Sequence, residues 1–162
     1  CCCTGHRPKS FPYPYGKDII KHKAYLKRLR QTILFIINEY GVTHFISGMA
    51  VGFDMDFAET VLNLRDEERY LITLECAIPC YDQTLKWSKP DKSRYDGLLR
   101  RTDRFIVISD QYTPECMFKR NRYMVDKSDV IIAFFNGIKK GGTWYTVDYA
   151  MKKNKIIKFI DF

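Results

Sequence analysis

Residues 45–56 constrain the fold of this chain more than any other stretch, because they combine a strand signal, a glycine turn and a helix signal. A short β-forming run ends at Ser47 and Gly48, Gly52 follows four residues later, and apolar residues recur at helical spacing from Phe53 onward. The N–H groups of such a turn and the dipole of the helix favour an anion, and phosphate is the expected one. Turns of this kind also occur without a ligand, so the motif alone leaves a purely structural role open.

Strand signals and helix signals alternate along almost the whole chain. The predicted strands cover residues 1–3, 43–46, 71–78, 105–109, 130–135 and 155–162. The predicted helices cover residues 17–40, 53–64, 92–102, 119–129 and 144–153, and a loop is expected at residues 79–83. This alternation predicts one α/β domain over residues 1–162, with a mostly parallel sheet that carries helices on both faces.

Ligands in this architecture bind outside the carboxyl ends of the strands, where the strand order reverses. Three glycine-containing segments follow such ends, residues 4–8, 47–54 and 136–143, and the last contains Lys139 and Lys140. Their convergence predicts a phosphate-binding crevice. The turn residues expected to bind the ligand are Gly5, His6, Arg7, Ser47, Gly48, Met49, Ala50, Gly52, Asp54, Gly141, Gly142 and Thr143.

The segment after the first turn is rich in proline and aromatic residues. Its prolines prevent a helix, and it places Phe11, Tyr13 and Tyr15 outside any predicted strand or helix. These rings have two possible roles. They could form a mobile lid that stacks on a base, or they could cover the edge of the domain.

The charge balance favours partners that carry phosphate. The net charge is +8, from 27 Lys and Arg residues against 19 Asp and Glu residues. This excess suits a nucleotide and a nucleic-acid strand equally, so charge does not identify the ligand. The basic residues of helix 17–40 are typical of a solvated helix face, with a nucleic-acid contact as the alternative.

Cysteine spacing and hydropathy exclude several other classes of protein. The six cysteines contain no CxxC and no histidine at ligand spacing, so neither a metal site nor a cofactor is expected. No apolar run approaches the roughly 20 residues of a membrane helix, and the first residues lack a signal-peptide pattern. We therefore expect a cytoplasmic protein without a membrane partner.

Four segments together resemble the SLOG superfamily, which includes the Smf/DprA and Lonely Guy proteins, and within it the YpsA-like bacterial and phage proteins. They are residues 4–8, 47–54, 120–131 and 141–150. The resemblance implies a Rossmann-like fold that binds nucleotides or nucleotide-derived molecules at the glycine turns, as a homodimer or higher homo-oligomer. It adds Arg120 and Asn121 to the residues expected to bind the ligand.

The resemblance leaves three functions open. The first is a sensor or sequestering protein for a signalling nucleotide of the ADP-ribose type, as in antiphage systems and the proteins that counter them. The second is a Lonely Guy-like hydrolase that releases the base from a nucleoside monophosphate, with Arg120 and Asp148 as catalytic residues; residues 141–148 lack that family's third glycine and its glutamate. The third is the binding of single-stranded DNA, as in Smf/DprA proteins.

Overall fold

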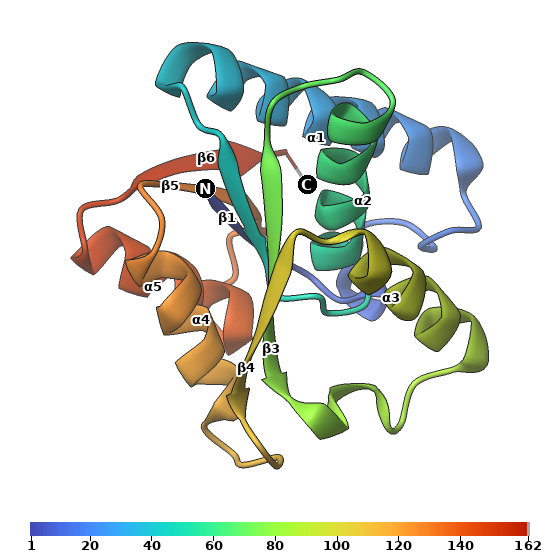
Figure 1. The fold of residues 1–162 in the computed structure, drawn as a ribbon, viewed down its shortest axis with the longest axis vertical. Helices are drawn as coiled ribbons and strands as arrows, with labels where there is room; N and C mark the ends of the chain where they lie inside the picture. The colour runs from blue at the N-terminus through green and yellow to red at the C-terminus, as the bar shows by residue number, and fades with distance from the viewer. Residues whose placement is uncertain (162) are drawn as a thin grey trace.

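A computed structural model describes residues 1–161, and its centre is one six-stranded parallel sheet (Figure 1). The strands are β1 (Cys2–Gly5), β2 (His44–Ser47), β3 (Thr73–Cys80), β4 (Arg104–Ser109), β5 (Val130–Phe134) and β6 (Ile156–Ile160). The helices are α1 (Ile19–Tyr40), α2 (Phe53–Asp66), α3 (Lys89–Arg101), α4 (Cys116–Asp126) and α5 (Gly141–Lys152). Two 3-10 turns cover Pro8–Ser10 and Tyr81–Thr84. The predicted α/β fold with a parallel sheet is confirmed.

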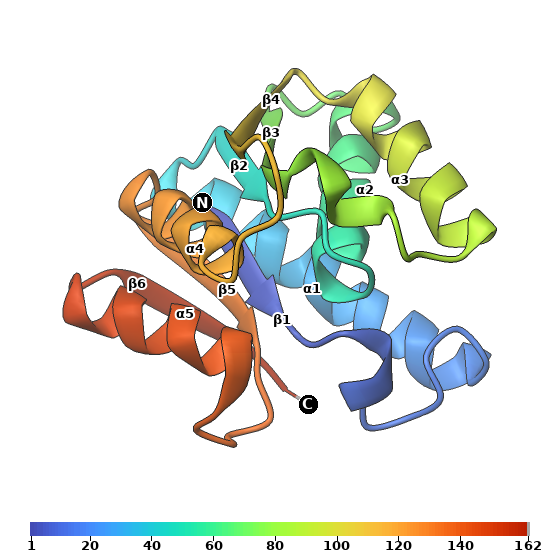
Figure 2. The same cartoon turned by 90° about the horizontal axis from the view of Figure 1, so that it is seen from below.

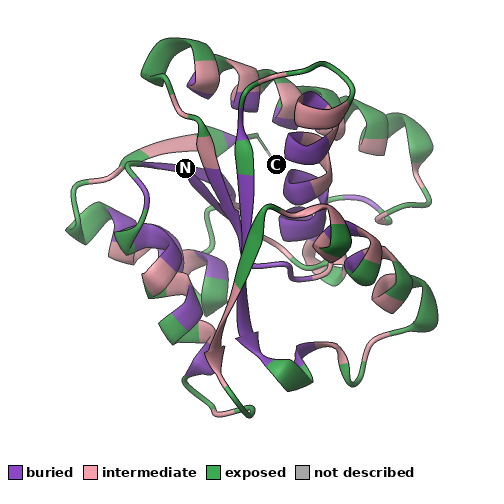
Figure 3. Cartoon of the chain, in the orientation of Figure 1, coloured by how far each residue is buried: buried purple, intermediate pink, exposed green. Residues whose placement is uncertain are grey.

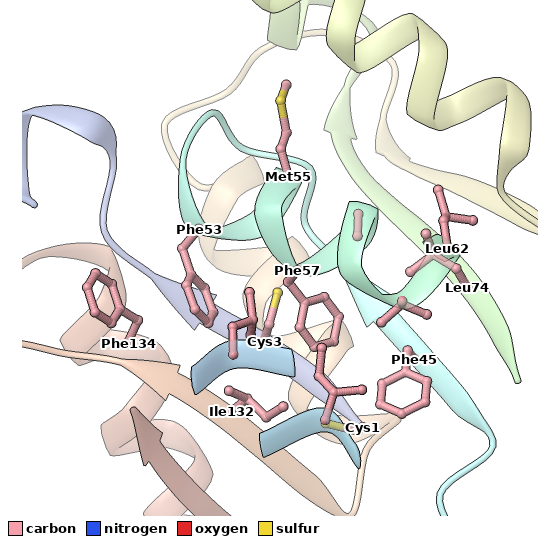
Figure 4. Packing of buried hydrophobic residues seen from close by; sticks show 14 of the residues in the cluster. Cys1, Cys3, Phe45, Phe53, Met55, Phe57, Leu62, Leu74, Ile132 and Phe134 are labelled. Atoms are coloured by element: carbon pink, nitrogen blue, oxygen red, sulfur yellow. The ribbon is translucent and has the colours of Figure 1, made fainter. Parts of the chain in front are cut away.

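Helices cover both faces of the sheet, with α1, α2 and α3 on one face and α4 and α5 on the other (Figures 1 and 2). Successive side chains of a strand point to opposite faces. In β1, Cys3 therefore packs in the core beneath α1 and α2, beside Phe53 and Phe57 (Figure 4), whereas Cys2 packs in the core beneath α4 and α5. The four central strands, β1, β2, β3 and β5, are consequently the most buried strands of the sheet (Figure 3).

The strand order places the reversal point of the fold between β1 and β5. The sheet runs β4-β3-β2-β1-β5-β6, so the chain moves outward from β1 to β4 and then returns to pair β5 with β1. In the parallel pairing, Gly5 lies opposite Phe134 at the carboxyl ends of the two strands. A crevice is expected above this pair, because neighbouring connections leave on opposite faces there.

Helix boundaries follow local capping rather than the spacing of apolar residues. The side chain of Asp18 accepts a hydrogen bond from the N–H of Lys21 at 3.0 Å, which starts α1 two residues later than predicted. The prediction for α3 was wrong at its start, since Ser88 caps the helix by accepting from the N–H of Asp91 at 3.3 Å. Pro90 is tolerated because it lies in the first turn.

The carboxyl end of β3 also differs from the prediction, which placed a loop at residues 79–83. β2 stops opposite Cys76, so β3 continues beyond that point with β4 as its pairing partner. Pro79 therefore lies in the part of β3 that pairs with β4 on one side only. In such a position the absence of a backbone N–H group costs little. The start of α4 at Cys116 and the start of α5 at Gly141 are also three residues earlier than predicted, and β6 ends at Ile160. Phe162, which the prediction included in the last strand, lies outside the described residues.

The aromatic residues after the first turn belong to the core. Phe11 and Tyr13 are buried, and the ring of Phe11 lies 5.4 Å from that of Tyr25. The hydroxyl groups of Tyr15 and Tyr25 donate hydrogen bonds to the buried carboxylate of Asp56, at 2.7 Å and 3.0 Å. This packing favours the covering role over a mobile lid. Within residues 1–161, no helix is long and apolar enough to cross a membrane.

Gly5 is required by close packing against α2. A Cβ atom at this position would overlap the ring of Phe53, the first residue of α2. The ring cannot withdraw easily, since it stacks on Phe134 at 5.6 Å between ring centres. The absence of a side chain at Gly5 therefore sets how closely α2 approaches β1.

We expect Gly5→Ala to reduce the free energy of unfolding by about 1–3 kcal/mol, because overpacking of a filled core has this cost. Gly97→Ala is the matched control: Gly97 lies within α3, its added Cβ meets nothing within 4 Å, and alanine favours a helix. Urea denaturation measures both. Equal midpoints for Gly5→Ala and the parent would show that α2 is free to shift.

Candidate functional site

A cavity of about 680 Å³ lies over the carboxyl ends of β1 and β5, where the strand order reverses. Its walls come from the segment after β1, the turn after β2, helix α4 and the start of α5. The lining residues are Cys3, Thr4, Gly5, His6, Arg7, Lys9, Ser10, Ala50, Asp54, Met117, Arg120, Asn121, Met124, Asn136, Ile138, Lys140, Gly141, Gly142 and Thr143. The structure therefore brings together ten of the fourteen residues predicted to bind the ligand.

The first turn of α5 faces this cavity with open backbone. N–H groups in the first turn of a helix have no acceptor within the helix. Within residues 1–161, those of Gly141 and Gly142 have no backbone acceptor elsewhere either. A Cβ atom added at Gly142 would meet nothing within 4 Å, so the space beside it is empty. The hydroxyl group of Thr143 donates to the carbonyl of Gly5 at 3.0 Å, which fixes the start of α5 to the end of β1.

The turn after β2, in contrast, is closed by the protein itself. Nη1 of Arg120 donates a hydrogen bond to the carbonyl of Gly48, and a Cβ atom at Gly48 would overlap the guanidinium group. The N–H of Ala50 donates to the carboxylate of Asp54 at 3.3 Å. The N–H of Phe53, at the start of α2, donates to the carbonyl of His6 at 3.3 Å.

This closure corrects the expectation of bare N–H groups at the turn after β2. The N–H groups of Met49, Ala50 and Phe53 donate within the protein, and Asp54 already places a carboxylate at the start of α2. Gly48 is glycine because Arg120 fills the space of a side chain. Ser47, Gly48, Met49 and Gly52 do not line the cavity, and their role is to shape the turn.

Arg120 and Asp54 form a buried ion pair at the floor of the cavity. Nη1 of Arg120 lies 3.6 Å from Oδ2 of Asp54, and Nε donates to Oδ1 of Asn121 at 2.8 Å. Burial raises the pKa of Asp54, and the charge of Arg120 opposes that rise. Burial likewise lowers the pKa of Arg120. Because Nε and Nη1 are bonded to the protein, a phosphate at this position would share the guanidinium with Asn121 and the carbonyl of Gly48.

The other polar residues of the cavity lie nearer to its mouth. Arg7, Lys9 and Lys140 are exposed cations. Nε2 of His6 accepts a hydrogen bond from the N–H of Asn136 at 3.3 Å, and burial lowers the pKa of His6. His6 is therefore a neutral side chain that joins the segment after β1 to the segment after β5.

Asp148, predicted as a catalytic residue, does not line the cavity. Its carboxylate pairs with Lys152 at 2.6 Å on the outer part of α5. Asp56 and Glu75, two other carboxylates that could stabilise a cationic sugar, are committed to internal networks. Asp54 is the carboxylate that lines the cavity within residues 1–161.

Sequence reasoning missed several lining residues, including Lys9, Met117, Asn136, Ile138 and Lys140 as ligand-binding positions. Lys140 and Asn136 carried a usable signal, because both lie in the glycine segment after the apolar strand β5. Met117 carried none, since it reaches the cavity through the earlier start of α4. Within residues 1–161, no group of three or more His, Cys, Asp or Glu side chains could hold a metal ion.

Comparison with known proteins places this site in a family context. The YspA SLOG family matches the chain over residues 1–162. The UPF0398 protein YpsA of Bacillus subtilis (strain 168) is 25% identical over 154 residues, which cover 94% of this chain and 84% of that protein. A UPF0398 protein of Bacillus pumilus is 28% identical over 150 residues, 91% of this chain and 78% of its own length. An uncharacterized SPbeta prophage-derived protein of Bacillus subtilis, YoqJ, is 29% identical over 149 residues, 82% of this chain and 85% of its own length.

We expect Arg120→Leu to destabilise the fold by about 3–5 kcal/mol, because it leaves the carboxylate of Asp54 buried and unpaired. When folding raises the pKa of a carboxyl group, the ionised form destabilises the folded state at pH values above the folded pKa. Below the pKa of the unfolded chain the group is protonated in both states, and this penalty is absent. The loss should therefore be larger near pH 7 than near pH 4. Urea denaturation at both pH values measures it, with Arg122→Leu, an exposed arginine on the same helix, as the control.

The double variant Arg120→Leu with Asp54→Asn separates charge from packing. If the unpaired charge causes the loss, removing it should restore part of the stability and abolish the difference between the two pH values. A pH-independent loss in the single variant would assign Arg120 a packing role instead.

Proposed function

The chain belongs to the YspA SLOG family, and from this premise we propose that its cavity binds a nucleotide or a nucleotide-derived, ADP-ribose-like molecule through a phosphate at the start of α5. The protein would serve as a sensor of a signalling nucleotide or would sequester it. The observation that carries the proposal is the open first turn of α5, where the N–H groups of Gly141 and Gly142 face the cavity without backbone acceptors in residues 1–161.

The charges around this turn support an anionic ligand. Lys140 precedes the helix directly, and Arg7 and Lys9 line the same cavity from the other side. All three are exposed, so they can adjust to a ligand without loss of buried contacts. The helix dipole adds roughly half a positive charge at the same end. The negative charge of Asp54 is offset by Arg120 at the cavity floor, which leaves the mouth positive.

The remainder of the cavity suits a nucleoside. Its volume of about 680 Å³ is in the usual range of small-molecule sites. Met117, Met124 and Ile138 give it an apolar wall on which a base could lie. Asn121 uses its Oδ1 to accept from Arg120, so its NH₂ group is available to donate to a ligand. A phosphate at α5 and a base against the methionines would span the cavity from mouth to floor.

Release of bound small molecules tests this proposal whatever the identity of the ligand. Molecules freed from the purified protein by denaturation should include a phosphate-bearing nucleotide derivative, identified by mass spectrometry. Protein that is purified empty should bind ADP-ribose or AMP in calorimetric titration. A single-stranded oligonucleotide serves as the competing probe, because its binding would fall steeply with salt. Binding of the oligonucleotide alone would contradict the proposal.

Gly142→Val should weaken the binding of ADP-ribose at least tenfold, worth about 1.4 kcal/mol, because the side chain would fill the space beside the open N–H groups. The melting temperature without ligand should change little, since an added Cβ meets nothing within 4 Å. Gly97→Val is the matched control, a helical glycine with equally open surroundings outside the cavity. Unchanged affinity in Gly142→Val would remove α5 from the site.

A base-releasing hydrolase is the second candidate, and the position of Asp54 in the cavity favours it. Cleavage of an N-glycosidic bond passes through a cationic sugar, which a nearby carboxylate can stabilise. Chromatography after incubation with nucleoside monophosphates would show free base. If the protein is such an enzyme, Asp54→Asn should lower its rate by about 100-fold or more, on the order of other catalytic carboxylates, while Asp148→Asn should not. An active enzyme that loses its rate only in Asp148→Asn would restore the sequence-based assignment.

A further inference from the structure

The two edge strands of the sheet differ in how they are protected. β6 carries Lys158 at its centre, and the Lys158 ammonium lies 4.9 Å from the ring of Phe35 and 5.2 Å from that of Tyr40, both on α1. A lysine within an edge strand discourages pairing with another chain. β4, at the opposite edge, has the sequence Arg-Phe-Ile-Val-Ile-Ser and contains no charge after its first residue.

β4 also has the other properties of a strand that is open to pairing. It pairs with β3 on one side and is the last strand of the sheet on the other (Figure 2). None of its six residues is buried, and the side chain of Phe105 is 54% exposed. It contains no proline, and its register with β3 is regular from Arg104 to Ser109. Its outer edge therefore presents a row of backbone donors and acceptors beside apolar side chains that are exposed, at Phe105, or half-buried, at residues 106–108.

We propose that β4 pairs antiparallel with β4 of a second copy of this chain, so that two sheets join into one across a two-fold axis. In the proposed register, Arg104 of one copy lies opposite Asp110 of the other. Val107 then lies opposite Val107 of the second copy, so the two-fold axis passes beside this residue. Phe105 would then face Ser109 of the second copy, with Val107 of that copy as a diagonal neighbour on the same face. Ile106 would face Ile108.

The charges at the two ends of β4 select this orientation and this occupant. At the amino end, Arg101 and Asp103 form ion pairs with Asp66 and Arg65, which leaves Arg100 and Arg104 as the remaining charges there. Asp110 and Glu115 follow the carboxyl end. Antiparallel pairing brings the basic end of each copy to the acidic end of the other, and parallel pairing would bring like charges together. Nε of Arg104 donates to the buried carboxylate of Glu75 at 2.8 Å, yet the Arg104 side chain remains 59% exposed and within reach of a second partner. A surface that is complementary to itself is what a two-fold contact requires.

The pairing leaves the cavity accessible. The cavity lies over β1 and β5, and the strands β2 and β3 separate it from the β4 edge. The joined sheet would carry one cavity on each side of the axis, both open to solvent. The proposed contact is therefore independent of ligand binding, and it holds or fails separately from the function proposed for the cavity.

Sedimentation velocity over a range of concentrations tests the contact. We expect the parent to form a dimer and Phe105→Glu to remain monomeric, because a charge on this edge opposes pairing. Phe159→Glu on β6 is the matched control, since Phe159 is a 51% exposed phenylalanine on the other edge strand, and it should dimerise as the parent does. A parent that is monomeric at all concentrations, or a dimer that Phe105→Glu leaves intact, would overturn the proposal.

A cysteine pair tests the register. The six native cysteines are buried, so an added thiol at the surface is the one that a mild oxidant such as diamide reaches first. Val107→Cys should give a disulfide-linked dimer on a non-reducing gel, because residue 107 faces itself across the axis. Phe105→Cys should not, since its two copies would be more than about 13 Å apart and a disulfide needs Cα atoms within about 7 Å. Cross-linking through residue 105 but not residue 107 would contradict the antiparallel register.

Discussion

The buried pair between Arg120 and Asp54 is the interaction on which the site depends. It joins α4 to the first turn of α2, and through the hydrogen bond from Arg120 to the carbonyl of Gly48 it also holds the turn after β2. Two segments that are distant in sequence, residues 48–54 and α4, thereby become one floor beneath the cavity. Taking two charges out of water is costly unless each gains partners, and here Asn121 and the N–H of Ala50 supply them. Removing either charge would leave the other exposed to that cost.

This pair is one reason why the proposed anion site lies at the start of α5 and not at the turn after β2. A strand–glycine–helix turn binds an anion through free N–H groups. In the turn after β2, the N–H groups of Ala50 and Phe53 already donate to the carboxylate of Asp54 and to the carbonyl of His6. The start of α5 also has helix N–H groups, but within residues 1–161 those of Gly141 and Gly142 have no backbone acceptor. The two helix N-termini therefore have different roles, with α2 contributing structure to the floor and α5 offering the open donors. Lys140, Arg7 and Lys9 add positive charge to the cavity, because all three are exposed residues that line it.

The sequence predicted the architecture well because the fold rests on signals that repeat many times. The alternation of apolar strands and amphipathic helices determined the fold class, and the glycine segments after β1 and β5 marked the reversal point, as Gly5 and Gly142 show. The role of Gly48 was not predictable, since the group that fills its side-chain space comes from residue 120, and no local pattern encodes that contact. Asp148 was predicted as a catalytic residue, but it does not line the cavity. It lies six residues after Gly142 in α5, which places it on a different face of the helix and further along the helix axis. The start of α3 was encoded by Ser88 and Asp91, a capping signal that Pro90 obscured.

The central claim is that the ligand's phosphate binds at the start of α5 and not at the turn after β2. The most direct measurement is a titration of ¹⁵N-labelled protein with ADP-ribose, followed through the backbone amide resonances. We predict the largest shifts at Gly141, Gly142 and Thr143, with the amides of Met49 and Ala50 nearly unchanged because their acceptors lie within the protein. Large shifts at Gly48 and Ala50, with residues 141–143 unperturbed, would contradict the account.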